Sequence, residues 1–201
     1  NLLLNGDVSA NSASSFNEPS PKGSVNVTTT VRSGAAAQST PKTVQIVDTS
    51  NFSDQPTVSA RAALIMDAQT GEVLFGKNTN TSLPIASITK LMTAVVTADA
   101  RLNMSEQITL QQIDFAGAGG KNSSSTLRVG DKMNRAETLL FALMKSENPA
   151  AAALARTYPG GRNAFYAAMN AKARSLGMTS THYVESSGLD PRNVASARDL
   201  G

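Results

Sequence analysis

Ser87 and Lys90 are the residues of this sequence whose types and spacing best suit nucleophilic chemistry. They stand three positions apart at the start of an apolar stretch, so on a helix the hydroxyl and the amine share one face within hydrogen-bond reach. A serine becomes nucleophilic only with a base, and a buried lysine whose pKa is lowered by desolvation or a neighbouring cation can be that base. The helix N-terminus would add backbone N–H groups suited to an oxyanion. The pair therefore predicts a serine nucleophile that needs no histidine.

The Ser-x-x-Lys spacing alone is weak evidence, because ordinary residue usage produces such matches by chance. Ser39-Thr-Pro-Lys42 also fits the spacing. In that copy a proline precedes the lysine and no apolar helix follows, so we interpret it as chance. On spacing alone, a helix cap and a solvated lysine would be the better interpretation of Ser87 and Lys90 as well.

Ser146 and Asn148 form a second polar group, between an apolar helical segment and the alanine-rich stretch after Pro149. A loop at this position could aim both side chains across a cleft toward Ser87. Ser-x-Asn is itself a common pattern. Copies near the N-terminus are Ser9–Asn11, Ser15–Asn17 and Ser24–Asn26. Position therefore favours the Ser146 copy, with an ordinary polar loop between helices as the alternative.

Composition excludes several other kinds of site. The 201 residues include no cysteine, no tryptophan, 4% aromatic residues and one histidine, His182. Thiol nucleophiles, disulfides and cysteine or multi-histidine metal sites are therefore excluded. The serine chemistry expected here needs neither a metal nor an organic cofactor. The net charge of +3 comes from scattered basic residues, so nucleic acid is not an expected partner. His182 is expected to be a structural or surface residue.

The sequence also bears on membranes and export. No stretch approaches the apolar length that spans a bilayer, so no membrane span is expected. The first residues, Asn1–Asn5, lack an initiating Met, a basic flank and a full signal core. We expect the numbering to begin after processing or trimming, which leaves export open.

The elements that must position these residues begin after a polar N-terminal stretch. Residues 1–56 are rich in Ser, Thr, Asn, Ala and Pro, which predicts a flexible low-complexity tail, with a short strand possible where Thr43–Asp48 alternates. Residues 57–201 are expected to form the ordered domain. Its first element is predicted to be a hairpin of Ala62–Met66 and Val73–Phe75, joined by turn residues.

Helices are predicted to follow this hairpin. Five apolar residues at helical spacing predict a largely buried helix: Ile88, Leu91, Met92, Val95 and Val96. A mostly helical lobe is expected over about residues 101–185. In it, Asn134 and Glu137 have capping-box spacing, and Asn163 opens a helix that Gly177 ends. Strands followed by helices, without β-α-β alternation, predict an α+β fold over a doubly wound sheet.

The sequence around Ser87 resembles a known family. The matching segments are Met66–Phe75, Pro84–Ala94, Met144–Asn148 with its Ser-Glu-Asn, Met169–Met178, Thr181–Val184 and Ala197–Leu200. Together they resemble the low-molecular-mass penicillin-binding proteins, the D-alanyl-D-alanine carboxypeptidases and endopeptidases. The resemblance extends over about residues 58–201.

This resemblance implies a fold and a role for each site residue. The fold would be α+β of the serine β-lactamase/DD-peptidase type, an antiparallel sheet packed on helices with an inserted helical lobe. Ser87 would be the nucleophile and Lys90 its general base. Ser146 would relay a proton to the leaving amine, and Asn148 would hold Lys90; both would also bind substrate. The expected activity is periplasmic hydrolysis of D-alanyl cross-links in peptidoglycan peptides through an acyl-enzyme, with β-lactams as covalent inhibitors.

Alternatives to this activity stay open. Glu147 stands where carboxypeptidase members more often have glycine, and Ser-Glu-Asn is closer to the murein DD-endopeptidase branch. A D-alanyl-D-alanine carboxypeptidase with the same residues is the nearest alternative. A serine β-lactamase would need a deacylating group that the sequence does not reveal. From another class, the chain could be a non-catalytic cell-wall binding module.

One part that the resemblance implies does not occur in the sequence. The family's third motif, Lys-Thr-Gly on a sheet strand, would supply a second cation, an edge for the substrate peptide and one oxyanion N–H. Ser196–Asp199 has the signature of a helix start, yet Gly201 ends the sequence soon afterwards. We therefore expect a missing C-terminal part that carries this motif.

Overall fold

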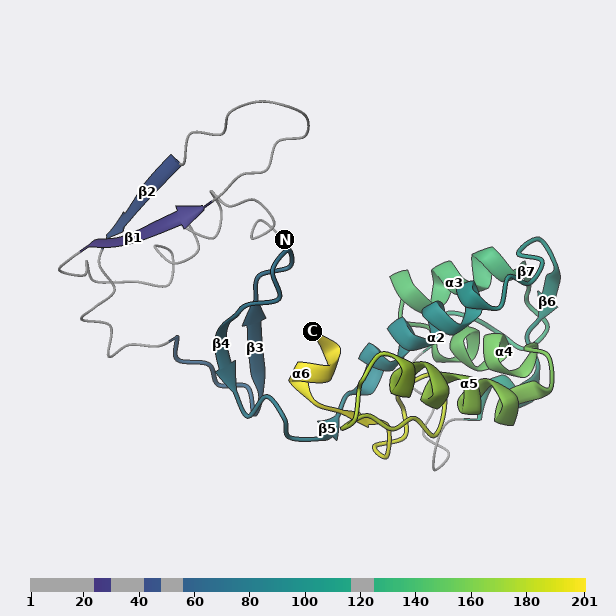
Figure 1. Ribbon diagram of the computed structural model, residues 1–201. Helices are drawn as coiled ribbons and strands as arrows, with labels where there is room; N and C mark the ends of the chain where they lie inside the picture. Colours follow the sequence, from purple (N-terminus) through teal and green to yellow (C-terminus); the bar gives the residue numbers. More distant parts are fainter. Residues whose placement is uncertain (1–23, 30–41, 48–55, 117–124) are drawn as a thin grey trace. The chain divides into compact units, whose positions relative to one another are not determined.

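The computed structural model describes residues 24–29, 42–47, 56–116 and 125–201 (Figure 1). The chain divides into two compact units, Asn1–Thr79 with Gly201 and Asn80–Leu200. The described residues of the first unit form strands, and the second unit holds the described helices and two small antiparallel sheets. Among the described residues, no helix is both long enough and apolar enough to cross a membrane.

Two strands lie in the segment for which the sequence predicts a tail. Strand β1 (Ser24–Thr29) pairs antiparallel with β2 (Lys42–Val47), with Ser24 opposite Val47. The second of them overlaps the alternating residues Thr43–Asp48, whereas nothing in the sequence indicated its partner. The other residues of the predicted tail lie outside the described ranges, so the tail and its boundary at residue 56 stay predictions.

The next two strands form the hairpin that the sequence predicts. Strand β3 (Ala63–Met66) pairs antiparallel with β4 (Val73–Lys77). Asp67 builds the turn, because its Oδ1 accepts hydrogen bonds from the backbone N–H groups of Gln69 and Thr70 at 2.7 and 2.9 Å. Gly71 follows with φ +74°, a conformation that glycine adopts without strain. The predicted hairpin is thereby confirmed.

The second unit is a small helical body with two short sheets (Figure 1). Its elements are β5 (Leu83–Pro84), η2 (Ala86–Ile88), α2 (Thr89–Asp99), β6 (Gln107–Thr109), η3 (Gln112–Phe115), β7 (Lys132–Asn134), α3 (Arg135–Met144), α4 (Asn148–Arg156), α5 (Gly161–Ser175), β8 (Val194–Ala195) and α6 (Ala197–Leu200). One apolar cluster joins α2 to α5 through residues such as Met92 and Phe165. A second joins α4 to β6 and β7 through residues such as Leu154 and Met133.

Helix α4 packs against α2, α3 and α5. Four of its residues are fully buried alanines, Ala150, Ala151, Ala153 and Ala155. Because these side chains are small, the neighbouring helices can approach closely on more than one side. This packing fixes the N-terminal end of α4, where Asn148 stands, and Pro149 suits the first turn because it needs no hydrogen-bonded N–H there.

Helix α2 differs from the sequence prediction of a largely buried apolar helix. Met92 and Val96 are buried, but Ile88, Leu91 and Val95 are 45%, 61% and 38% exposed. The buried side of the helix is instead completed by polar residues, Thr89, Lys90, Thr93 and Thr97. Their polar atoms find hydrogen-bond partners, as buried polar groups must. A count of apolar residues alone could not identify this face.

The helix ends agree in part with the sequence prediction. The capping box of α3 is confirmed, since the Asn134 side chain accepts from the Glu137 N–H and the Glu137 side chain accepts from the Asn134 N–H, both at 2.8 Å. Helix α5 ends before Gly177 as predicted, but it begins at Gly161 and not at Asn163. Its start follows Gly160, whose φ of +88° turns the chain into the helix.

Candidate active site

Ser87 and Lys90 are placed by the entry into α2. Strand β5 pairs with β8, and the N–H of Ile85 donates to the carbonyl of Asn193 at 3.2 Å. The chain then makes the 3-10 turn η2, which carries Ser87, and continues as α2, which carries Lys90. Ser87 is exposed, whereas Lys90 is only 2% exposed. Lys90 Nζ lies 3.2 Å from Ser87 Oγ, as the spacing predicts.

The structure brings all four predicted site residues together around the Lys90 amine. Lys90 Nζ contacts Ser146 Oγ at 3.1 Å and Asn148 Oδ1 at 2.7 Å, in addition to Ser87 Oγ. Ser146 Oγ also lies 3.0 Å from Ser87 Oγ, which closes a triangle of two hydroxyls and the amine. A fourth acceptor, the backbone carbonyl of Ser187, lies 3.0 Å from Nζ. The catalytic roles of these residues stay predictions.

Ser146 and Asn148 come from the tight connection between α3 and α4. Ser146 follows the C-cap of α3 with φ +54°, a left-handed conformation unusual for serine, and the N–H of Glu147 donates to the carbonyl of Phe141 at 3.1 Å. Ala86, directly before Ser87, has φ +47°. Such conformations cost about 1–3 kcal/mol each and persist only where the surrounding packing enforces them. Both site serines therefore depend on a backbone that its neighbours hold in place.

Burial shapes the charge state of Lys90. Desolvation lowers the pKa of the Lys90 amine below its ordinary value of 10.5, while the negative charges of Glu185 and Glu147 act in the opposite direction. Because the desolvation effect is the larger, the ammonium loses its proton more readily than that of a solvated lysine. This is the property that a lysine base requires.

The four contacts also suit a neutral amine. A neutral lysine has two N–H groups and one lone pair. Asn148 Oδ1 and the Ser187 carbonyl can only accept hydrogen bonds, and they can take both N–H groups, at 2.7 and 3.0 Å. The lone pair is then left for a hydroxyl proton from Ser87 or Ser146. In this arrangement the amine can accept a proton from one serine and return it through the other.

Glu147, which the sequence singled out within Ser-Glu-Asn, forms its side-chain hydrogen bonds with residues other than Lys90. Its carboxylate accepts hydrogen bonds from Ser125 Oγ, from Thr126 Oγ1 at 2.6 Å and from the Thr126 N–H at 3.0 Å. Burial alone would raise the pKa of Glu147, but these hydrogen bonds outweigh it and hold the pKa below its ordinary value. Glu147 is therefore an anionic anchor for residues 125–126 beside the site.

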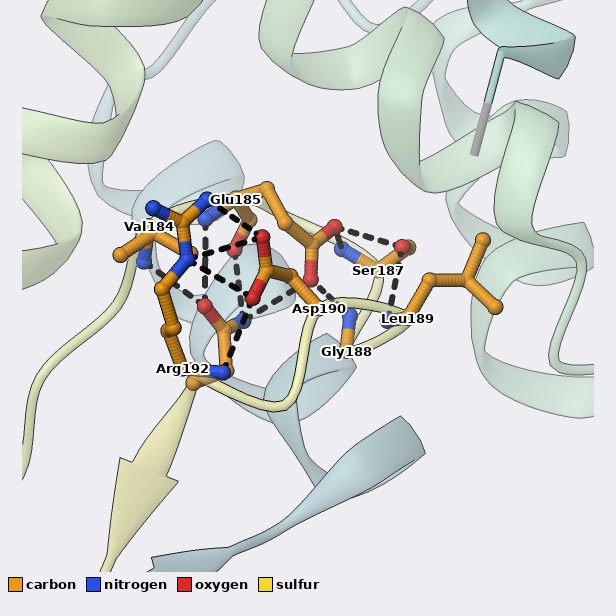
Figure 2. Close-up of polar contacts among 8 residues, drawn as sticks. Val184, Glu185, Ser187, Gly188, Leu189, Asp190 and Arg192 are labelled. Carbon is orange, nitrogen blue, oxygen red and sulfur yellow. Dashed lines mark hydrogen bonds and ion pairs between the residues drawn. The ribbon is translucent and has the colours of Figure 1, made fainter. Parts of the chain in front are cut away.

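Sequence reasoning missed the loop that completes the site, residues 184–193 (Figure 2). The carbonyl of Ser187 contacts Lys90, and Gly188 lies so close to η2 that an added Cβ would stand 1.8 Å from the Ala86 carbonyl oxygen. The matching segments named above stop at Val184 and resume at Ala197, on either side of this loop. A glycine among polar turn residues was the available signal, but a backbone carbonyl has no signature of its own.

His182 and metal chemistry lie outside this arrangement. The His182 backbone pairs with Val194, and its side chain is exposed. Within the described ranges, no group of three or more His, Asp or Glu side chains could hold a metal ion.

Comparisons with known proteins identify the relatives of the chain. A family model described as D-alanyl-D-alanine carboxypeptidase, peptidase S11, matches residues 49–201. A D-alanyl-D-alanine endopeptidase of Pseudomonas aeruginosa is 49% identical over 146 residues, which are 73% of this chain and 46% of that protein. A D-alanyl-D-alanine endopeptidase of Escherichia coli is 44% identical over 161 residues, 80% of this chain and 51% of that protein. The chain thus spans about half the length of these relatives.

Solved structures of DD-peptidases are also similar to this chain. The crystal structure of the Streptomyces K15 DD-transpeptidase matches with a TM-score of 0.66 and 31% identity, over 73% of this chain and 59% of that one. A D-alanyl-D-alanine carboxypeptidase of Mycobacterium tuberculosis matches with a TM-score of 0.64 and 32% identity, over 72% and 54%. The predicted α+β fold of the serine β-lactamase/DD-peptidase type is confirmed.

The close approach of Gly188 to η2 yields a stability prediction. Gly188 and Gly130 have similar φ angles, +90° and +93°, but only Gly188 has backbone atoms where a Cβ would stand. Gly130→Ala should lower the free energy of unfolding by about 1–2 kcal/mol, the cost of a left-handed alanine. Gly188→Ala should lower it at least about twice as much, because the loop must also move off η2. Urea unfolding followed by far-UV circular dichroism measures both, and equal losses would contradict the contact.

Proposed function

The chain belongs to peptidase family S11, the D-alanyl-D-alanine carboxypeptidase family, and from this premise we propose that it acts as a serine DD-peptidase on peptidoglycan peptides. The observation that carries the proposal is the buried Lys90 amine, which lies 3.2 and 3.1 Å from the hydroxyls of Ser87 and Ser146. A lysine in this environment can exchange a proton with a serine that attacks a carbonyl. The proposed reaction needs no metal or organic cofactor.

In the proposed acylation step, Ser87 Oγ attacks a D-alanyl carbonyl carbon while Lys90 Nζ takes the hydroxyl proton. The oxyanion forms near the backbone N–H groups at the start of η2, which are suited to negative charge. The peptide C–N bond then breaks, and the leaving amine receives the proton from Lys90 through Ser146. Asn148 holds the amine at 2.7 Å throughout and offers its amide group to the substrate.

In the proposed deacylation step, water attacks the acyl group on Ser87 and Lys90 accepts the water proton. The proton returns to Ser87 Oγ as the ester bond breaks, which restores the starting state. A β-lactam would acylate the same serine by opening its own amide bond. Because no amine product leaves in that case, the acyl group would stay on Ser87 and block the site.

We further propose that the preferred substrate is a D-alanyl cross-link between two peptide chains, in the periplasm, where peptidoglycan lies. This preference rests on the two endopeptidase relatives, at 49% and 44% identity. The Ser-Glu-Asn sequence supports it too, because it is closer to the murein DD-endopeptidase branch than the Ser-Gly-Asn of many carboxypeptidases. A carboxypeptidase that removes a terminal D-alanine with the same residues is the second candidate, since the family model carries that description.

The β-lactamase alternative has little support from the described residues. It needs a deacylating group, which in the class A enzymes is a glutamate that activates water. Glu147 and Glu185 are the carboxylates whose charges act on Lys90. Both carboxylate oxygens of Glu147 accept hydrogen bonds, from Ser125 and Thr126. Both carboxylate oxygens of Glu185 likewise accept hydrogen bonds, from Ser187 and Gly188. Neither is placed as a base for water.

Substrate preference is tested with the full-length protein and two defined peptidoglycan fragments. We expect a cross-linked muropeptide dimer to be cleaved with a higher kcat/KM than a linear pentapeptide muropeptide, as chromatography of the products would measure. Preferential release of D-alanine from the pentapeptide would favour the carboxypeptidase. Cleavage of neither fragment, with no penicillin adduct, would favour a non-catalytic wall-binding module.

The nucleophile is tested with two serines that share the Ser-x-x-Lys spacing but differ in context. Ser87→Ala should abolish covalent labelling of the full-length protein by a fluorescent penicillin, because the attacking oxygen is gone. Ser39→Ala should leave labelling intact, since only Ser87 is followed by an apolar helix. Labelling on a denaturing gel reads out both variants. Equal loss in both would show that Ser87 is misassigned.

The base is tested by changing the chemistry of Lys90 while keeping its charge. Lys90→Arg should slow penicillin acylation about as severely as Lys90→Ala, by about a hundredfold or more, because a guanidinium stays protonated and cannot accept the serine proton. Stopped-flow or gel kinetics of acylation measure the rate constants. An arginine variant that acylates at near the wild-type rate would show that Lys90 contributes only its positive charge and that another group is the base.

A further inference from the structure

The carboxylate of Glu185 organises the loop that completes the site (Figure 2). Its Oε2 accepts hydrogen bonds from the Ser187 N–H at 2.6 Å and the Ser187 hydroxyl at 2.5 Å. Its Oε1 accepts from the Gly188 N–H at 2.5 Å and from Asn193 Nδ2 at 3.0 Å. Charge-assisted hydrogen bonds of this length are among the strongest in proteins. A single side chain thus folds the Ser187–Gly188 turn.

Asn193 ties this turn to α2. It is fully buried, at 0% exposure. Its Oδ1 accepts from the N–H groups of Val184 and Glu185 at 2.7 and 3.2 Å, and its Nδ2 donates to Thr89 Oγ1 at 3.1 Å. Thr89 is the residue directly before Lys90 in α2. The Glu185 network therefore has a fixed position relative to the helix that carries the amine.

The turn that Glu185 folds touches both members of the reactive pair. The Ser187 carbonyl accepts from Lys90 Nζ at 3.0 Å. On the next residue, Gly188 lies directly against the Ala86–Ser87 peptide, where only a glycine fits. Glu185 itself contacts neither Ser87 nor Lys90 by a hydrogen bond that the structure records, so its influence passes through the backbone of residues 187–188.

We propose that Glu185 is a positioning residue for the Ser87–Lys90 pair, acting through the Ser187 carbonyl that orients the Lys90 amine. This inference rests on the proposed function, because it assigns Glu185 to the acylation step of that same site. Without the carboxylate, the N–H groups of Ser187 and Gly188 lose their acceptor and the turn can relax. The amine then loses one of the two acceptors that direct its lone pair toward Ser87.

The charge of Glu185 also acts on the pKa of the Lys90 amine, an effect separate from the folding of the turn. Among the described residues, the charged groups that act on Lys90 are Glu185, from this loop, and Glu147, from the connection before α4; both raise the pKa of the amine against desolvation. Lys145 acts on Glu147, and Tyr166 of α5 lies within the field of Glu185. Removing the negative charge of Glu185 therefore leaves Lys90 with a lower pKa than in the wild type.

Asp190 provides a matched control within the same loop (Figure 2). Its carboxylate also accepts from a backbone N–H, that of Arg192 at 2.9 Å, and it pairs with the Arg192 side chain at 2.7 Å. The Arg192 side chain is 75% exposed. Neither residue has a recorded contact with Lys90, Ser187 or Gly188. Neutralising Asp190 thus changes a loop carboxylate without touching the turn.

The test compares Glu185→Gln, Glu185→Asp and Asp190→Asn in the full-length protein, using a fluorescent penicillin to measure the acylation rate constant across pH. Glu185→Gln should lower the plateau rate constant by about tenfold to a hundredfold, the usual effect of a small misplacement of reacting groups. Its acidic limb should move to lower pH, because the rate rises as Lys90 loses its proton and the Lys90 pKa has fallen. Asp190→Asn should change neither quantity.

Glu185→Asp separates the two effects and covers the case in which Glu185→Gln does not fold. It keeps the charge but shortens the side chain. The plateau of the acylation rate constant should therefore fall, while the acidic limb of its pH profile stays near the wild-type position. Rate constants are compared per folded molecule, with thermal unfolding measured in parallel. Wild-type rates and profiles in either Glu185 variant, even with a lower unfolding temperature, would make Glu185 merely structural and overturn the inference. Labelling that persists in the Ser87→Ala variant would instead overturn the proposed function itself.

Discussion

The buried amine of Lys90 is the constraint on which the rest of the second unit depends. It is 2% exposed and has four polar partners, supplied by η2, the α3–α4 connection and the 184–193 loop. A buried amine without partners would be strongly destabilising. Three separate segments must therefore converge on one atom, and the left-handed backbones of Ala86 and Ser146 are consistent with that requirement.

Polar and small side chains make up much of the buried surface of α2 and α4. Where an ordinary amphipathic helix would bury apolar residues, α2 buries threonines whose hydroxyls bond to neighbouring backbone, as Thr93 does to the Ser186 carbonyl at 2.7 Å. Helix α4 supplies alanines, which leave room for close approach. The carboxylates of Glu147 and Glu185 act on the amine through their charge, while their oxygens are occupied by other donors. Their negative charges offset part of the lowering of the Lys90 pKa that desolvation causes. Neither carboxylate forms a direct ion pair with the amine, which leaves the amine free to exchange a proton.

The sequence predicted those features that have a local signature. The Ser87–Lys90 spacing, the turn of the first hairpin and the Asn134–Glu137 cap each depend on residues a few positions apart, and the structure has all three. It could not predict the Ser187 carbonyl as a partner of Lys90, because a backbone acceptor can belong to any residue and the contact joins positions far apart in sequence. The buried face of α2 was missed because threonine counts as polar in a periodicity pattern.

The central claim, that Lys90 is a buried amine poised to be a base, is tested most directly by titrating that amine. In the full-length protein with labelled lysine, the ¹³Cε resonance of Lys90, assigned by its loss in Lys90→Arg, reports the protonation state of Nζ. The structure predicts that this resonance titrates with a pKa below 10.5, the ordinary value, since desolvation outweighs the charges of Glu185 and Glu147. A pKa at or above 10.5 would show an ammonium stabilised as a permanent cation, and it would contradict the assignment of Lys90 as the base.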